Sequence, residues 1–166
     1  MPVIDYPIQH KKQTKLNDCW YASIQMLKTH ASGGAKAKST GTSAEHLHGG
    51  VFGHRLHADK KNSKHFEKVL EDNGLITLPG LVARMNKPDH VYKFLDEFEP
   101  IVLGGTFGEV AFLKGFGHFI VLAGVDTDSR TYKIYDPAKK KPQWVSIDTI
   151  ANKFWDDADS AFAVNT

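Results

Sequence analysis

The sequence has a single cysteine, Cys19, in 166 residues. One cysteine excludes an internal disulfide, so nothing ties the fold to an oxidising compartment. The formal net charge is only +2, too small to argue for binding to nucleic acid or to a membrane surface. No apolar run approaches the length of a membrane span, and the first twelve residues lack the apolar stretch of a signal peptide.

The composition that remains is that of a globular protein. Hydrophobic residues make up 41% of the chain and charged residues 24%, and the length suits one domain over residues 1–166. No internal repeat is visible. The glycines before His118 follow no phosphate-loop pattern, because the lysine–serine and the strand-to-helix context are missing. We therefore expect no cofactor.

The only cysteine stands where a helix is predicted to begin. Asn17 or Asp18 can cap the helix, and apolar residues recur behind it at helical spacing. A helix N-terminus favours the thiolate, which is the reactive form of cysteine. Gln13, six positions upstream, can point an amide towards the thiol. A lone cysteine is more often a buried small residue, so the nucleophile hypothesis needs a histidine base and an orienting group.

Both partners occur late in the chain. His118 opens an apolar strand that runs to Val125, and the next strand begins at Thr131 and closes on Asp136. The polar residues 126–130 between them predict a hairpin. Antiparallel pairing brings the start of the first strand near the end of the second. We therefore expect His118 and Asp136 to be neighbours, as a catalytic base and its orienting acid must be.

These motifs, taken in order, resemble the papain-like cysteine peptidase superfamily. A glutamine is followed after five residues by Cys-Trp at a helix start, then by Gly-His with an apolar strand, then by Tyr-Asp-Pro. The chain is most similar to the compact bacterial branch, which includes bacteriocin-leader-processing peptidases and plant-pathogen effector proteases. The resemblance implies an oxyanion-binding glutamine at Gln13, a nucleophile at Cys19, a base at His118 and an orienting acid at Asp136. Residues 31–62 carry no motif of that superfamily that we recognise.

That unmatched segment is rich in histidine. Glu45 precedes four histidines within residues 45–57, and these are His46, His48, His54 and His57. Their spacing fits no zinc motif, and no cysteine pair supports one. We expect a polar loop that flanks the substrate cleft and binds no metal.

The pattern of elements predicts an α+β fold. A helix is expected over residues 17–30, a second from Ser63 to about Asn73, and a third that opens at Pro88. Strands are expected at residues 75–78, 100–105, 117–125, 131–136, 143–147 and 160–164, with a short helix over 147–155. The resemblance implies a papain-like arrangement in which a helical N-terminal lobe with Cys19 packs on a twisted antiparallel sheet with His118 and Asp136.

The expected function is hydrolysis of a peptide or amide bond, with a protein or peptide as substrate and a monomer as the working form. Two alternatives use the same residues or the same fold: a cysteine deamidase or acyltransferase, and a non-catalytic peptide-binding module. We expect the protein in the cytoplasm, or delivered to a target cell without a signal peptide as an effector or toxin. An inhibitor or immunity protein is then a possible partner.

Overall fold

The sheet of this α+β protein draws its strands from both ends and the middle of the chain. A computed structural model describes residues 3–12, 19–31, 70–71, 73–105, 118–154 and 161–165. Within these ranges the elements are β1 (Val3–Asp5), α1 (Cys19–Ala31), β2 (Leu75–Thr77), the 3-10 helix η3 (Val82–Arg84), α4 (Pro88–Phe98), β3 (Ile101–Gly105), β4 (His118–Asp126), β5 (Thr131–Tyr135), β6 (Gln143–Ser146), α5 (Ile147–Ile150) and β7 (Ala161–Val164).

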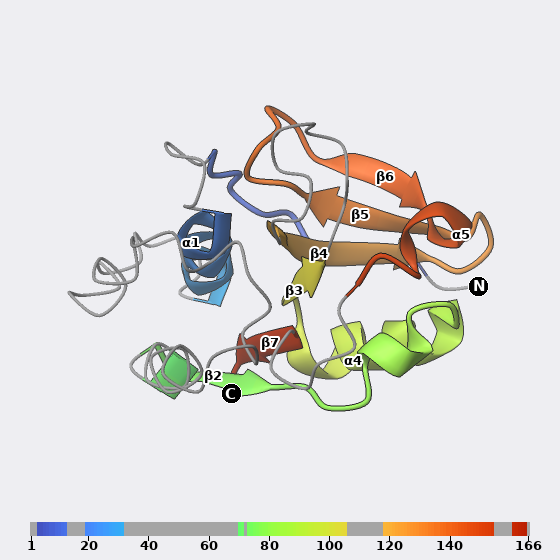
Figure 1. Ribbon diagram of the computed structural model, residues 1–166, viewed down its shortest axis with the longest axis horizontal. Helices are drawn as coiled ribbons and strands as arrows, with labels where there is room; N and C mark the ends of the chain where they lie inside the picture. The colour runs from blue at the N-terminus through green and yellow to red at the C-terminus, as the bar shows by residue number, and fades with distance from the viewer. Residues whose placement is uncertain are drawn as a thin grey trace.

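Strand β4 is the centre of this sheet. Among the described residues the strand order is β2-β7-β3-β4-β5-β6, and every pairing is antiparallel. Residues 118–122 of β4 pair with β3 and residues 124–126 pair with β1. Both partners lie on the same edge of β4, because β5 pairs with residues 121–126 on the other edge. Strand β1 therefore continues the line of β3 along β4, the strand to which it is paired. Figure 1 shows the labelled strands of the sheet.

The side chains of β4 alternate between the two faces of the sheet, because successive residues of a strand point to opposite sides. One face carries Phe119, Val121 and Ala123, which share a core cluster with Ile24 and Leu27 of α1. The other face carries Ile120 and Leu122, which share a second cluster with Val91 and Leu95 of α4. Helices α1 and α4 thus cover opposite faces, as Figure 1 also shows.

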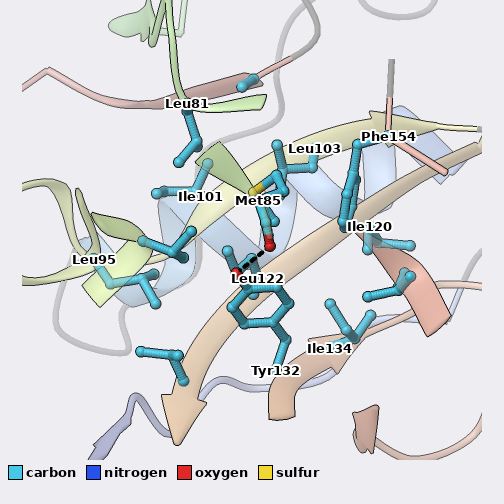
Figure 2. Packing of buried hydrophobic residues seen from close by; sticks show 14 of the residues in the cluster. Leu81, Met85, Leu95, Ile101, Leu103, Ile120, Leu122, Tyr132, Ile134 and Phe154 are labelled. Carbon is cyan, nitrogen blue, oxygen red and sulfur yellow. Dashed lines mark hydrogen bonds between the residues drawn. The ribbon is translucent and has the colours of Figure 1, made fainter. Parts of the chain in front are cut away.

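A tyrosine stabilises the α4 side of the core. Tyr132 of β5 is fully buried, and its hydroxyl donates to the carbonyl oxygen of Met85 over 2.6 Å (Figure 2). Burial raises the pKa of Tyr132 above its ordinary value, with Arg130 acting weakly in the opposite direction. The phenol therefore stays neutral and remains a donor. This bond connects the residue after η3 to β5, the strand that leads to Asp136.

Most of the predicted elements occur, with three differences. The extended N-terminal segment includes a true strand, β1, which the short apolar run did not indicate. The helix expected over 147–155 ends at Ile150, and Phe154 instead forms an isolated bridge with Gly105 of β3. The 3-10 turn η3 was not expected. Most of the helix predicted from Ser63 lies outside the described residues, but Leu70 and Glu71 are helical and Gly74 follows with φ +65°.

Gly124 is required where β1 crosses close to β4. A Cβ atom at this position would lie 2.6 Å from the backbone oxygen of Ile4, 3.1 Å from Cβ of Lys133 and 3.3 Å from the ring of Trp144. Since the nearest atom belongs to backbone, the clash can be relieved only by moving β1. We expect Gly124→Ala to lower the free energy of unfolding by about 1–3 kcal/mol, measured by chemical denaturation.

Gly74→Ala is the matched control for this prediction. It also adds one methyl group, but no atom lies within 4 Å of the new Cβ, and only the positive φ opposes it. That strain amounts to about 1–2 kcal/mol. A Gly124→Ala protein as stable as the wild type would show that β1 does not press on β4.

Candidate active site

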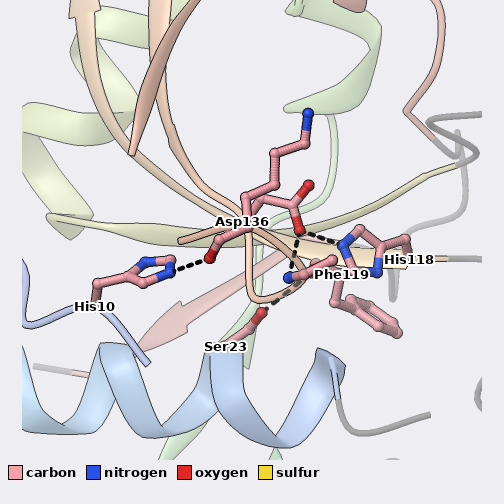
Figure 3. Close-up of polar contacts among 7 residues, drawn as sticks. His10, Ser23, His118, Phe119 and Asp136 are labelled. Atoms are coloured by element: carbon pink, nitrogen blue, oxygen red, sulfur yellow. Dashed lines mark hydrogen bonds and ion pairs between the residues drawn. The ribbon is translucent and has the colours of Figure 1, made fainter. Parts of the chain in front are cut away.

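The β4–β5 hairpin brings His118 and Asp136 together. His118 is the first residue of β4, and Asp136 directly follows the last residue of β5. Val121 pairs with Tyr135 in the register of the hairpin, so the chain beyond Tyr135 runs towards the start of β4. His118 Nε2 lies 2.5 Å from Asp136 Oδ1 (Figure 3). The two side chains are 11% and 18% exposed, which leaves the pair only a narrow access to water.

The carboxyl of Asp136 is held by its own turn as well as by His118. The amide of Ala138 donates to Asp136 Oδ1 over 2.9 Å, and the amide of Lys139 donates to the backbone oxygen of Asp136 over 3.0 Å. Burial raises the pKa of Asp136, but the His118 bond and charge, the Ala138 amide and the charge of Lys139 outweigh it and leave that pKa below its ordinary value. Asp136 is therefore a stable anion beside the imidazole.

A histidine from the N-terminal segment reaches the same turn. His10 Nε2 lies 2.6 Å from the backbone oxygen of Lys139, and the His10 ring lies 5.8 Å from the ring of Tyr135, centroid to centroid. No local sequence pattern marks His10, because it follows an extended segment and its partner is 129 residues away. Only knowledge that residues 3–10 run beside β4 and β5 would have indicated this contact.

Helix α1 is attached to β4 one residue beyond His118. The buried hydroxyl of Ser23 donates to the backbone oxygen of Phe119 over 3.3 Å (Figure 3). Ser23 lies four residues after Cys19, the first residue of α1, which corresponds to about 6 Å along a helix. The backbone at Cys19 is thus carried by the same turn of helix that is fixed to the strand of His118.

Two of the four predicted site residues lie wholly or partly outside the described residues. Gln13 lies outside the described residues, as does the side chain of Cys19, so their positions relative to His118 stay a prediction. The histidine-rich segment 45–57 also lies outside them. Within the part of the chain that the structure describes, no three His, Cys, Asp or Glu side chains are grouped so that they could hold a metal ion. No described helix has the length and apolar character needed to cross a membrane.

The lowered pKa of Asp136 predicts a change of stability in acid. A carboxyl whose pKa is lower in the folded state stabilises the fold above the unfolded value of about 3.9, and this stabilisation is lost as the pH falls through the folded value. The Tm of the wild type should therefore exceed that of Asp136→Asn near neutral pH, and the difference should shrink below about pH 4. Thermal denaturation between pH 2 and pH 7 measures it.

The control for this prediction is Asp96→Asn, which removes a carboxylate from an exposed position on α4. Asp96 is not part of the His118–Asp136 pair, so this variant shows how much of the change arises from removing any one carboxylate. A difference between wild type and Asp136→Asn that widened in acid would contradict the anionic state of Asp136 in the pair.

Comparison with known proteins agrees with the observed fold. A search among curated proteins finds no match. A solved structure described as a double glycine motif protease from an AMS/PCAT transporter, in complex with the leader peptide, superposes with a TM-score of 0.52. The match covers 96% of this chain and 91% of that one at 14% identity, and so shows a shared papain-like fold.

The comparison with family models identifies the family of the chain in addition to its fold. Residues 2–154 match the model of the family described as papain-like cysteine protease AvrRpt2. This range includes Gln13, Cys19, His118 and Asp136, and all the described elements except β7. Since the match extends over nearly the whole chain, the protein belongs to this family and is a papain-like cysteine protease.

Proposed function

We propose that the protein cleaves peptide bonds with Cys19 as nucleophile, His118 as base, Asp136 as the group that orients His118, and Gln13 as oxyanion donor. The observation that carries this assignment is the His118–Asp136 hydrogen bond of 2.5 Å. His118 begins β4, and Ser23 of α1 bonds to that strand at Phe119. Helix α1 begins with Cys19, the only cysteine of the sequence. A buried imidazole held by an anion is the arrangement that activates a thiol.

The contact between the two residues supports a different role for each imidazole nitrogen. Since the carboxylate of Asp136 accepts the hydrogen of Nε2, Nδ1 is the nitrogen that would exchange a proton with the Cys19 thiol. The negative charge of Asp136 stabilises the imidazolium that results. Asp136 need not take up the proton itself, and its lowered pKa favours this division of labour.

The reaction then follows in two steps. The Cys19 thiolate attacks the carbonyl carbon of the scissile bond, and the oxyanion accepts hydrogen bonds from the Gln13 amide and the Cys19 backbone N–H, each contributing about 3 kcal/mol. His118 gives its proton to the leaving amine as the C–N bond breaks, which leaves a thioester on Cys19. Water, deprotonated by His118, attacks the thioester, and the carboxylic acid product leaves with restoration of the thiol.

The substrate we propose is an extended segment of a protein or peptide. The structural neighbour is described in complex with a leader peptide, and the shared fold supports a similar mode of binding here. A deamidase or acyltransferase would use the same residues on a glutamine side chain, so the products distinguish the two. The family membership argues against the second alternative, a non-catalytic binding module.

The test is a comparison of products in a lysate. Wild type and Cys19→Ala are added in parallel, and newly formed protein N-termini are labelled and identified by mass spectrometry. New N-termini that depend on Cys19 would support peptidase activity. Release of ammonia from proteins that stay intact, without new N-termini, would instead indicate a deamidase and contradict the proposal.

The place of action is the second part of the proposal. The matching family is described as papain-like cysteine protease AvrRpt2. The motifs of the sequence also resemble those of plant-pathogen effector proteases. We propose that the protein acts as an effector or toxin after delivery to another cell, where an inhibitor protein would protect the producing cell. Detection of a tagged, inactive Cys19→Ala protein inside target cells after co-culture tests delivery. Retention of the protein in the producing cell under all conditions would contradict it.

A further inference from the structure

We propose that His10 is a positioning residue for the His118–Asp136 pair, because its ring N–H fixes the turn that carries Asp136. The proposal rests on the proposed function, since it assigns His10 a part in that same site. The polar contact that the described residues give His10 is with the turn and not with His118 or Asp136. It acts on the backbone of Lys139, three residues beyond Asp136.

A short chain of hydrogen bonds connects His10 with the carboxylate. The imidazole Nε2 of His10 lies 2.6 Å from the backbone oxygen of Lys139. The amide of that residue donates to the backbone oxygen of Asp136 over 3.0 Å, and the amide of Ala138 donates to Asp136 Oδ1 over 2.9 Å. Figure 3 shows His10 on one side of this turn and His118 on the other. The turn is therefore held from the side opposite to the catalytic pair.

The segment that carries His10 is itself well anchored. The amide of Tyr6 donates to the backbone oxygen of Ala123 over 2.9 Å, and the amide of Ile8 donates to the hydroxyl of Tyr135 over 3.2 Å. The hydroxyl of Tyr6 donates to the backbone oxygen of Leu95 over 2.9 Å. These bonds fix alternate residues of the segment before it reaches His10. The imidazole is thus presented to Lys139 from a rigid support.

The protonation of the ring follows from its partner. A backbone oxygen can only accept, so Nε2 carries the hydrogen and Nδ1 carries a lone pair in the neutral ring. This Nδ1 is buried and has no hydrogen-bond partner among the described residues. Among the described residues the ring therefore bonds through Nε2 alone, and its hydrogen bond to Lys139 is the contact through which it can act on the turn.

The turn needs such support because Asp136 lies beyond the last residue of β5, where the regular bonds of the sheet have ended. A catalytic group displaced by about 1 Å can lose up to a hundredfold in rate. Without the bond from His10, the backbone at Lys139 would lose one of the contacts that set the position of the carboxylate.

The test uses three substitutions at one position. His10→Gln keeps an N–H donor the same number of bonds from Cα, whereas His10→Phe keeps a ring without a donor. His10→Met is a second donor-free variant that fills the space flexibly. Hydrolysis of a peptide substrate gives kcat and KM, thermal denaturation gives Tm, and the NMR signals of the His118 ring, followed against pH, report its contact with Asp136 without substrate.

We expect both donor-free variants to lose about tenfold in kcat with KM within about twofold of wild type, since substrate contacts are unchanged. The midpoint of the His118 titration should fall in them, because a displaced carboxylate stabilises the imidazolium less. His10→Gln should restore both quantities to near the wild-type values at a similar Tm.

Several outcomes would overturn the proposal. Full activity and an unchanged His118 titration in His10→Phe or His10→Met would show that the bond does not position Asp136. Equal losses in the glutamine and donor-free variants would assign the role to the ring's shape and not to its N–H. Failure of both donor-free variants to fold, with a folded glutamine variant, would assign the bond to stability alone. If Cys19→Ala kept its activity, the proposed function would fail, and the NMR measurement would still test His10.

Discussion

Replacing Cys19 with alanine should abolish hydrolysis, with a loss of at least about a thousandfold to the uncatalysed background. The change removes one sulfur atom from the first turn of α1, so Tm should be nearly unchanged. The thiol itself gives a second measurement. A thiolate paired with an imidazolium reacts at low pH, so a small thiol reagent should modify the native wild type rapidly at pH 5–6, well below the free-cysteine pKa of about 8.5.

His118→Ala is the control for the labelling experiment, because it keeps Cys19 and removes its proposed partner. Labelling of this variant should slow at pH 5–6 and recover only in alkali. If instead the wild type reacted slowly and gained speed only above pH 8, Cys19 would be an ordinary thiol. The nucleophile assignment would then be wrong.

The second large loss of turnover is expected from substitutions of Asp136 that separate the effect of its charge from the effect of its hydrogen bonds. Its hydrogen bonds with His118 and Ala138 both end on Oδ1. Asp136→Asn can therefore keep both acceptor contacts and lose only the negative charge. We expect turnover to fall by about a hundredfold. Asp136→Ala, which loses both contacts and the charge, should fall further, and His118→Ala should be as inactive as Cys19→Ala.

Peptide hydrolysis by the four purified variants, each checked for folding by circular dichroism, measures this order. Equal and complete loss in the folded Asp136→Asn and His118→Ala proteins would contradict separate roles for the two residues. An Asp136→Asn protein as active as the wild type would show that the anion does not stabilise the imidazolium.

The sequence predicted the local parts of this site well. The hairpin of β4 and β5 is indicated by two apolar strands and a polar turn, and its register alone brings His118 to Asp136. Helix α1 is indicated by its spacing. The α+β fold is confirmed, as is the assignment to the papain-like peptidases. The helix and the hairpin could be predicted because each depends on residues close together in the sequence, and the family assignment because its motifs occur in the expected order.

Features that depend on distant partners were missed. Strand β1 has only three residues, and it is a strand because the free edge of β4 beyond β3 accepts it. The helix predicted over 147–155 ends at Ile150, and Phe154 bridges to β3, far away in the sequence. His10 contacts a turn 129 residues later. No window of local sequence contains both partners of these contacts.

The position of β1 has a consequence for the order in which the enzyme becomes active during its synthesis. The segment that precedes Cys19 is bonded to residues 123–139, at separations of 117 to 129 residues. Contacts so far apart form late, and a growing chain presents its N-terminal part first. The ribosome thus releases Cys19 long before His118 and the turn that holds Asp136. Under the proposed assignment, chains truncated before Lys139 should therefore have no peptidase activity.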